Sequence, residues 1–132
     1  MIFAFVAAWW PLRNEPNVLF LHYSDMKRDH EGAVRRIARF LAMQPAAEHW
    51  PTILECTSFP WMKANEEKFE LRAQTRVPIL EKGAMIRKGR AGSAEDDGVT
   101  PAISAETAEI GRQVLPNEAA LEWCYRGGPL PA

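Results

Sequence analysis

Residues 18–25, with the sequence Val-Leu-Phe-Leu-His-Tyr-Ser-Asp, decide the fold that we expect of this chain. The four apolar residues 18–21 are unbroken, follow a turn cluster over residues 14–17, and end at polar side chains. A short apolar run of this kind, without polar alternation, is typical of a strand that a parallel sheet buries on both faces. We therefore predict a buried strand over residues 18–22. Ligands of open α/β sheets bind beyond the carboxyl ends of the strands, which places residues 23–25 at a candidate ligand site.

The clearest helix follows this strand. Asp29 is a plausible N-cap, Glu31 favours a first helical turn, and apolar residues recur at positions 34, 37, 38 and 41. The basic residues of this helix fall on its other faces and have two interpretations, a solvated face or a binding stripe. They are Arg35, Arg36 and Arg39.

Weaker patterns surround this pair of elements. Residues 2–13 predict a largely buried helix whose last turn Pro11 weakens. Residues 46–57 and 61–69 predict two helices, and residues 70–100, rich in glycine, predict a long loop with little regular structure. Towards the end, Ser104 is expected to cap a helix that reaches residue 115, and Asn117 a helix that reaches residue 125.

Composition excludes several classes of protein. The chain has 132 residues, enough for one domain, and a formal charge of −1, which argues against a partner such as nucleic acid. The apolar run over residues 1–10 is about half as long as a membrane-spanning helix, so no membrane association is expected. Two cysteines, Cys56 and Cys124, fit neither a disulfide scaffold nor a metal site, which favours a cytoplasmic location without a bound metal.

Local motifs do not identify an enzyme. The three histidines, at positions 22, 30 and 49, lack a recognisable nucleophile motif beside them, so no catalytic residue is assigned. Residues 82–92 (KGAMIRKGRAG) combine four cations with three glycines. Glycines let the backbone approach an anion, and Arg and Lys bind phosphate oxygens. Two interpretations stay open for this segment, a phosphate clamp and a flexible solvated loop.

Four blocks, in a constant order, carry a resemblance to a known family. They are residues 17–27 (NVLFLHYSDMK), 31–41 (EGAVRRIARFL), 57–63 (TSFPWMK) and 86–92 (IRKGRAG). Together they resemble the carboxy-terminal part of the cytosolic-type sulfotransferases, with the bacterial members expected to be most similar. The resemblance implies an α/β fold, namely the carboxy-terminal half of a P-loop-like doubly wound domain, mostly helical here, with the one strand at 18–22. Residues 1–132 would then belong to a single domain, with 70–100 as a long nucleotide-binding loop.

The same resemblance implies roles for particular residues. Family members transfer a sulfuryl group from 3′-phosphoadenosine-5′-phosphosulfate (PAPS) to a hydroxyl or amine of a small-molecule acceptor. In this sequence Tyr23 would contact the adenine, Phe59 would pack against it, and Thr57 and Ser58 would bond it. The 3′-phosphate of PAPS, or of its product PAP, would be held by Arg87, Lys88 and Gly89. Tyr23 and Phe59 could instead be core aromatics.

The chain also departs from the family pattern. Ser93, Ala94 and Glu95 stand where the family has an Asp-Trp-Lys or similar block. Family members are about twice as long, and the blocks that wrap the 5′-phosphosulfate and supply the catalytic histidine are not found in this sequence. The sequence thus looks like a truncated sulfotransferase that supplies the adenine and 3′-phosphate half-site and is inactive alone. The alternative is a non-catalytic helical interaction or nucleotide-binding module derived from a sulfotransferase. In either case one strand cannot form a sheet alone, so a homo-oligomer that covers the sheet edge is possible.

Overall fold

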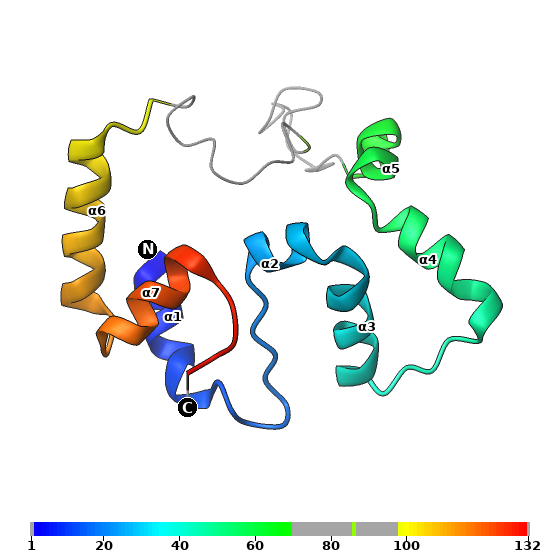
Figure 1. The fold of residues 1–132 in the computed structure, drawn as a ribbon, viewed down its shortest axis with the longest axis horizontal. Coiled ribbons are helices and arrows are strands. Elements are labelled where there is room, and N and C mark those ends of the chain that lie inside the picture. The colour runs from blue at the N-terminus through cyan, green and yellow to red at the C-terminus, as the bar shows by residue number, and fades with distance from the viewer. Residues whose placement is uncertain (1, 70–85, 87–97, 132) are drawn as a thin grey trace, which may run out of the picture.

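The computed structural model describes residues 2–69, 86 and 98–131, and all structural statements below concern these residues. They fold into helices joined by short turns and extended segments (Figure 1). The α-helices are α1 (Ile2–Trp9), α2 (Tyr23–Arg28), α3 (His30–Phe40), α4 (Trp50–Cys56), α5 (Phe59–Ala64), α6 (Pro101–Val114) and α7 (Glu118–Arg126). Single turns of 3-10 helix occur at η1 (Trp10–Leu12), η2 (Ala47–His49) and η3 (Glu66–Lys68).

The predicted strand over residues 18–22 is wrong. No strand forms within residues 2–69, 86 and 98–131, and this segment runs as unpaired backbone from the turn after η1 up to α2 (Figure 1). At its end the backbone is extended, with φ −100° and ψ 136° at His22. A strand exists only when a neighbouring backbone completes its hydrogen bonds, and the described residues offer none. The apolar segment is therefore extended, as expected of a strand, but it pairs with no other strand among the described residues.

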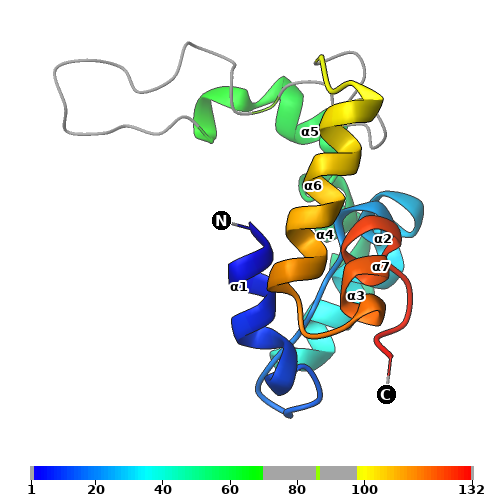
Figure 2. The ribbon, with the colours of Figure 1, turned by 90° about the vertical axis from the view of Figure 1, so that its left-hand side faces the viewer.

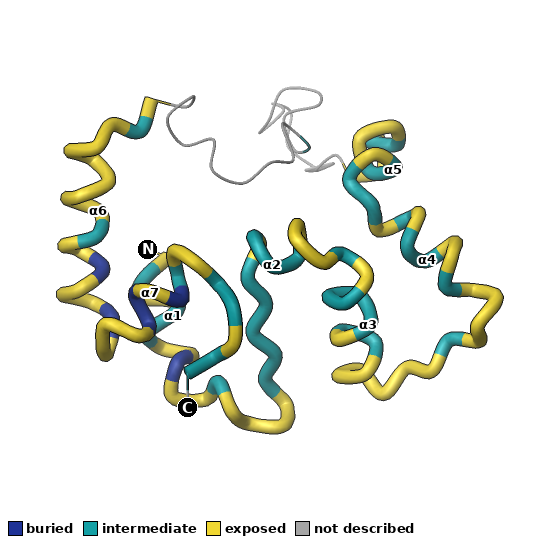
Figure 3. Tube along the Cα trace, in the orientation of Figure 1, coloured by how far each residue is buried: buried dark blue, intermediate teal, exposed yellow. Residues whose placement is uncertain are grey.

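A small aromatic core joins the two ends of the chain. Trp10 of η1 and Trp123 of α7 lie with ring centroids 5.9 Å apart, and Phe20 of the extended segment lies 6.1 Å from Trp10 and 5.5 Å from Trp123. α6 lies against both α1 and α7 (Figure 2). The buried residues cluster at η1, at the end of α6 and along α7 (Figure 3). They are Trp10, Leu115, Ala120, Leu121 and Trp123 among the hydrophobic ones.

Helix 2–13 is confirmed in its extent but not in its burial. α1 gives way to the 3-10 turn η1 where Pro11 occurs, as expected of a proline that weakens the last turn. Its side chains are nevertheless largely open to solvent, with Ile2 71% and Phe5 66% exposed. α1 packs against α6, and its Phe3, Val6 and Ala7 lie against the core cluster, so the remaining sides of this apolar helix are not covered by the described residues.

Side-chain caps mark the beginnings of α3, α6 and α7. Asp29 and Asn117 act as predicted, since Asp29 Oδ1 accepts the Gly32 N–H at 2.9 Å and Asn117 Oδ1 accepts the Ala120 N–H at 2.9 Å. The predicted cap at Ser104 is wrong. Thr100 caps α6 instead, accepting the Ile103 N–H at 3.3 Å. Pro101 then takes the first helical position, where its fixed φ is already suitable and its missing N–H costs nothing.

α2 is a helix that the sequence did not indicate. His22 caps it, with Nδ1 accepting the Ser24 N–H at 3.2 Å. Because Nδ1 accepts, Nε2 carries the proton and donates to the Cys124 carbonyl at 2.9 Å. Asp25 Oδ2 in turn accepts the Gly128 N–H at 2.7 Å. These bonds fasten α2 to the carboxy-terminal segment.

From α2 onward the chain forms an arm, defined here as α3, α4 and α5. Each helix of this arm contacts the next one along the chain, and none contains a buried residue (Figure 3). The Arg35 guanidinium of α3 lies 4.0 Å from the Trp50 ring centroid of α4, a cation–π contact. The arm is therefore held by surface contacts between sequential helices.

Candidate functional site

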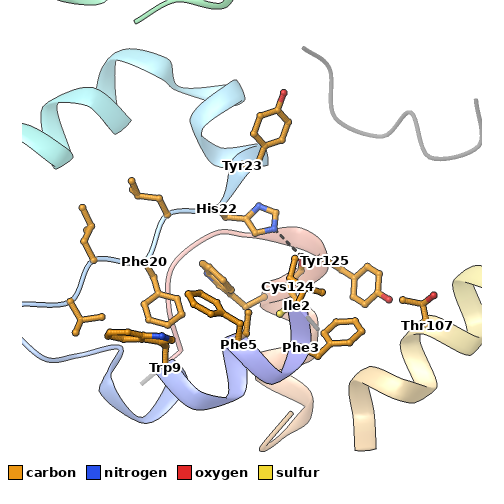
Figure 4. Close-up of a pocket in the computed structure, with 15 residues that line it drawn as sticks. Ile2, Phe3, Phe5, Trp9, Phe20, His22, Tyr23, Thr107, Cys124 and Tyr125 are labelled. Atoms are coloured by element: carbon orange, nitrogen blue, oxygen red, sulfur yellow. Dashed lines mark hydrogen bonds between the residues drawn. The ribbon is translucent and has the colours of Figure 1, made fainter. Parts of the chain in front are cut away.

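Tyr23 is placed by the cap of α2. It is the first residue of that helix, and its side chain is 48% exposed. Figure 4 shows its ring pointing away from the aromatic side chains around Phe20. The interpretation of Tyr23 as a core aromatic is therefore wrong, and its ring is accessible to a ligand.

Thr57, Ser58 and Phe59 form the junction between α4 and α5. Thr57 ends α4, and its Oγ1 donates to the Ile53 carbonyl at 2.8 Å. Ser58 caps α5, with Oγ accepting the Trp61 N–H at 3.3 Å, and Phe59 is the first residue of α5. Both hydroxyls are thus used in fixing the backbone of the junction, although each retains hydrogen-bonding capacity for a ligand.

Two side chains connect this junction to α2 and α3. Lys27 of α2 lies with Nζ 5.2 Å from the centroid of the Phe59 ring. His30 of α3 donates from Nε2 to the Thr57 carbonyl at 3.1 Å and lies 3.0 Å from Thr57 Oγ1. Because Lys27 is four residues after Tyr23, both occupy one face of α2. The structure therefore brings the element of Tyr23 and the junction of residues 57–59 together.

The predicted phosphate-binding residues Arg87, Lys88 and Gly89 lie outside the described residues. The residue before them, Ile86, is described, and its carbonyl accepts a hydrogen bond from Lys63 Nζ at 2.8 Å. Lys63 belongs to α5, and its ammonium also pairs with Glu66 at 2.7 Å. Residue 86 is therefore held at the same short helix that Phe59 begins.

The sequence missed the side chains that make these links. Lys27 and Lys63 each stand four residues after a predicted site residue on the same helix, Tyr23 and Phe59 respectively. Residues four apart lie on the same face of a helix, so this spacing could have predicted that the two lysines lie beside the site residues. The contact of His30 with Thr57 joins positions distant in the sequence, and no local pattern reports it.

His22 and His30 are occupied by hydrogen bonds to backbone carbonyls. Burial raises the pKa of the Cys124 thiol, which keeps it protonated and makes it a weak nucleophile. In the part of the chain that the structure describes, no group of three or more His, Cys, Asp or Glu side chains could hold a metal ion. The exposed Tyr23 ring and the half-buried Phe59 ring, with hydroxyls and a cation nearby, are groups that can stack on a purine and form hydrogen bonds with it.

Comparison with known proteins identifies the family. The family model described as "Sulfotransferase domain" matches residues 1–117, so the chain belongs to the sulfotransferase family. The chain is 37% identical over 90 residues to sulfotransferase 1B1 of the dog, covering 68% of this chain and 30% of that protein. It is 35% identical over 89 residues to the luciferin sulfotransferase of the firefly Photinus pyralis, covering 64% of this chain and 24% of that one.

A longer match shows the same disproportion in length. Human sulfotransferase 2A1 is 27% identical over 124 residues, which cover 88% of this chain and 43% of that protein. This chain thus spans less than half of the length of the curated relatives it matches. No solved structure matches it. These relatives are animal proteins, so the expected greater similarity to bacterial members stays a prediction.

Among residues 2–69, 86 and 98–131, no helix is long and apolar enough to cross a membrane.

Proposed function

We propose that this chain supplies the nucleoside half-site of a PAPS-dependent sulfotransferase. Tyr23, Thr57, Ser58 and Phe59 bind the adenine, and the block over residues 87–89 binds the 3′-phosphate. The small-molecule acceptor, a hydroxyl or an amine, binds elsewhere. A cytoplasmic location accords with the two cysteines, Cys56 and Cys124, both of which are free thiols.

The contact between Lys27 and Phe59 carries this proposal. It joins α2 to α5, and so joins two predicted adenine-binding elements that lie far apart in the sequence. An adenine ring that lies on Phe59 would gain stacking energy of about 1–3 kcal/mol. The neighbouring Lys27 ammonium would favour an anionic nucleotide over a neutral nucleoside.

The contribution of these residues to the reaction is positioning. In sulfuryl transfer a base deprotonates the acceptor hydroxyl, its oxygen forms a bond to sulfur, and the phosphate–sulfate bond breaks in line. Fixing the adenine and 3′-phosphate aligns the sulfuryl group for that attack. The groups that the resemblance assigns to the sulfuryl end are not in this sequence. We therefore expect the chain alone to bind nucleotide and to transfer no sulfuryl group from PAPS.

The test is a calorimetric titration of the chain with 3′,5′-adenosine bisphosphate and, separately, with 5′-AMP. We expect saturable binding of the bisphosphate and binding of 5′-AMP weaker by about a hundredfold, since a lost charged hydrogen-bonded group costs about 2–3 kcal/mol. The variant Arg87→Ala, Lys88→Ala is expected to bind both nucleotides equally weakly.

The matched control removes two cations elsewhere. Arg36 and Arg39 are exposed on α3, and Arg36→Ala, Arg39→Ala changes the net charge by the same amount. This control is expected to retain the preference for the bisphosphate. Equal affinities of the unaltered chain for the two nucleotides, or equal losses in the two double variants, would contradict the proposal, as would robust PAPS-dependent turnover by this chain.

A further inference from the structure

The hydroxyl of Thr57 is held from two helices at once. Its Oγ1 donates to the Ile53 carbonyl of α4 at 2.8 Å, and the Leu54 carbonyl lies farther away, at 3.4 Å. From α3, His30 Nε2 lies 3.1 Å from the Thr57 carbonyl and 3.0 Å from Thr57 Oγ1. His30 and Thr57 are 27 positions apart in the sequence, so this contact anchors the junction of residues 57–59 to a separate helix.

One lone pair of Thr57 Oγ1 remains for a ligand. A carbonyl oxygen can only accept, so His30 Nε2 carries the hydrogen and shares it between the Thr57 carbonyl and Oγ1. The single hydroxyl hydrogen of Thr57 is directed at the Ile53 carbonyl. The second lone pair of Oγ1 receives no hydrogen bond from residues 2–69, 86 and 98–131. Because Thr57 is exposed, a ligand at this hydroxyl meets an acceptor and no donor.

An acceptor at this point distinguishes purines by the group at C6. Adenine has an amino group there, which donates, whereas hypoxanthine and guanine have a carbonyl, which accepts. The amino group can donate to the open lone pair, but the carbonyl would bring two acceptors together and leave both without a hydrogen bond. The neighbouring Ser58 hydroxyl accepts only the Trp61 N–H, and its hydrogen can turn to suit either purine. Thr57 is therefore the discriminating group of the junction.

We propose that His30 is a positioning residue that makes the nucleotide site selective for adenine over a 6-keto purine, and that it acts through Thr57. This inference rests on the proposed function of the junction. His30 fixes the Thr57 side chain from α3, and a rotation that turned the hydroxyl hydrogen towards a ligand would break the bonds to both His30 and Ile53. Without His30, only the bond within α4 opposes that rotation.

A purely structural role for His30 predicts a different result. The bond from His30 to the Thr57 carbonyl joins α3 to the end of α4, and its loss alone would loosen the arm. Loosening of this kind weakens the binding of every nucleotide by the same factor. Loss of the hydroxyl orientation weakens the binding of adenine nucleotides selectively. The ratio of two affinities therefore separates the two roles.

The test is a calorimetric titration of the chain with 3′,5′-adenosine bisphosphate and with 3′,5′-inosine bisphosphate, whose base is hypoxanthine. We expect the unaltered chain to prefer the adenosine compound by about 10–100-fold. His30→Ala should reduce this preference by at least about fivefold. His30→Gln, whose side-chain amide can also donate an N–H to Thr57, should retain the preference. The matched control is His49→Ala, which removes an exposed histidine of η2 and should leave both affinities unchanged.

A double variant tests whether His30 acts through Thr57. Thr57→Val removes the hydroxyl with little change of shape and should abolish the preference. His30→Ala should then change it no further, because residues that act as a unit are not additive. Equal weakening of both nucleotides by His30→Ala, or no preference in the unaltered chain, would overturn this inference and leave the proposed function in place. A folded chain that binds neither nucleotide would overturn the proposed function and this inference with it.

The tautomer of His30 gives a second measurement that needs neither a nucleotide nor a variant. Nitrogen-15 shifts of its ring, recorded at alkaline pH where an imidazole is neutral, should show the hydrogen on Nε2. A hydrogen on Nδ1 would remove the donor to Thr57 and overturn the inference.

Discussion

The terminal unit, formed by α1, η1, α6 and α7, contains the buried hydrophobic residues of the described chain, whereas the arm of α3, α4 and α5 contains none. In the terminal unit, side chains distant in the sequence pack together, as Trp10 does with Trp123. In the arm, helices contact their sequential neighbours through surface pairs such as Arg35 and Trp50.

The residues that stabilise the fold and the residues that we propose bind nucleotide therefore lie in different regions. Burial of aromatic surface is the largest stabilising term available, while exposed ion pairs and single cation–π contacts contribute about 1 kcal/mol or less each. The arm carries the junction of residues 57–59, which we propose binds adenine. Elements of low local stability often carry binding sites, and a ligand then stabilises them by mass action. The arm should accordingly respond to nucleotide and the terminal unit should not.

The largest effect is expected from Trp123→Ala. The Trp123 ring contacts Trp10, Phe20 and His22, and its Nε1–H donates to the Gly128 carbonyl at 3.1 Å. Its removal should lower the free energy of unfolding by about 3–5 kcal/mol, measured by urea denaturation. Trp50→Ala, in the arm, is the matched control and should cost less than half as much. Equal losses would remove the distinction between the two regions.

The next effect concerns Gly127, which ends α7 and lies against His22 and Asp25 at the start of α2. Gly127 has φ +68°, and a Cβ there would meet Asp25 Oδ2 and His22 Nδ1 at 2.7 Å each. Gly127→Ala should therefore lower the free energy of unfolding by about 2–3 kcal/mol. Part of this loss comes from the disfavoured backbone conformation, and part from losing the hydrogen bonds that hold α2 to the carboxy-terminal segment. Gly98→Ala isolates the conformational part, because Gly98 has φ +85° with nothing within 4 Å, and about 1 kcal/mol is expected. Equal thermal unfolding midpoints for the two variants would show that the hydrogen bonds between α2 and the carboxy-terminal segment do not contribute to stability.

A smaller effect compares the same kind of cap in the two regions. Asn117→Ala and Asp29→Ala each remove one side-chain acceptor that caps a helix at 2.9 Å. About 1 kcal/mol is expected in each case. The loss at Asn117 should appear in global unfolding, because α7 carries the core. The loss at Asp29 should appear as faster amide exchange confined to α3. Asp29→Ala would speak against this account if it slowed or accelerated exchange in α7.

The smallest effect is expected at an exposed ion pair of the arm. Arg35 Nη2 lies 2.7 Å from Glu31 Oε1 at an i, i+4 spacing on α3. Glu31→Gln should cost about 0.3–0.5 kcal/mol, and added salt should reduce even this difference. Urea denaturation at low and high salt measures it. A loss above about 1 kcal/mol would mean that the arm depends on its ion pairs more than we infer.

Local features of the sequence predicted much of this fold. The periodicity around Val34 and Ile37 and the caps at Asp29 and Asn117 act within one or two helical turns, and the helices that they predict are confirmed. The strand over residues 18–22 failed because a strand depends on a partner elsewhere, which local sequence does not report. α2 was missed because its cap, His22, is also held by the distant Cys124 carbonyl.

The candidate site divides in the same way. Tyr23 and Phe59 were proposed from the resemblance. In the structure Tyr23 is half-exposed and Phe59 lies beside Lys27. That these two elements approach each other is a tertiary fact that no spacing in the sequence reveals. The roles of Arg87, Lys88 and Gly89 rest on the sequence alone, because these residues lie outside the described part of the chain.

The most direct test of the central claim is an NMR titration of the chain with 3′,5′-adenosine bisphosphate that follows backbone amides one by one. We predict saturable shifts at Tyr23, Thr57 and Phe59, with Ala120 and Trp123 unchanged. Saturable shifts confined to the terminal unit, or no shifts in a folded chain, would contradict the claim that the arm and α2 form the nucleotide site.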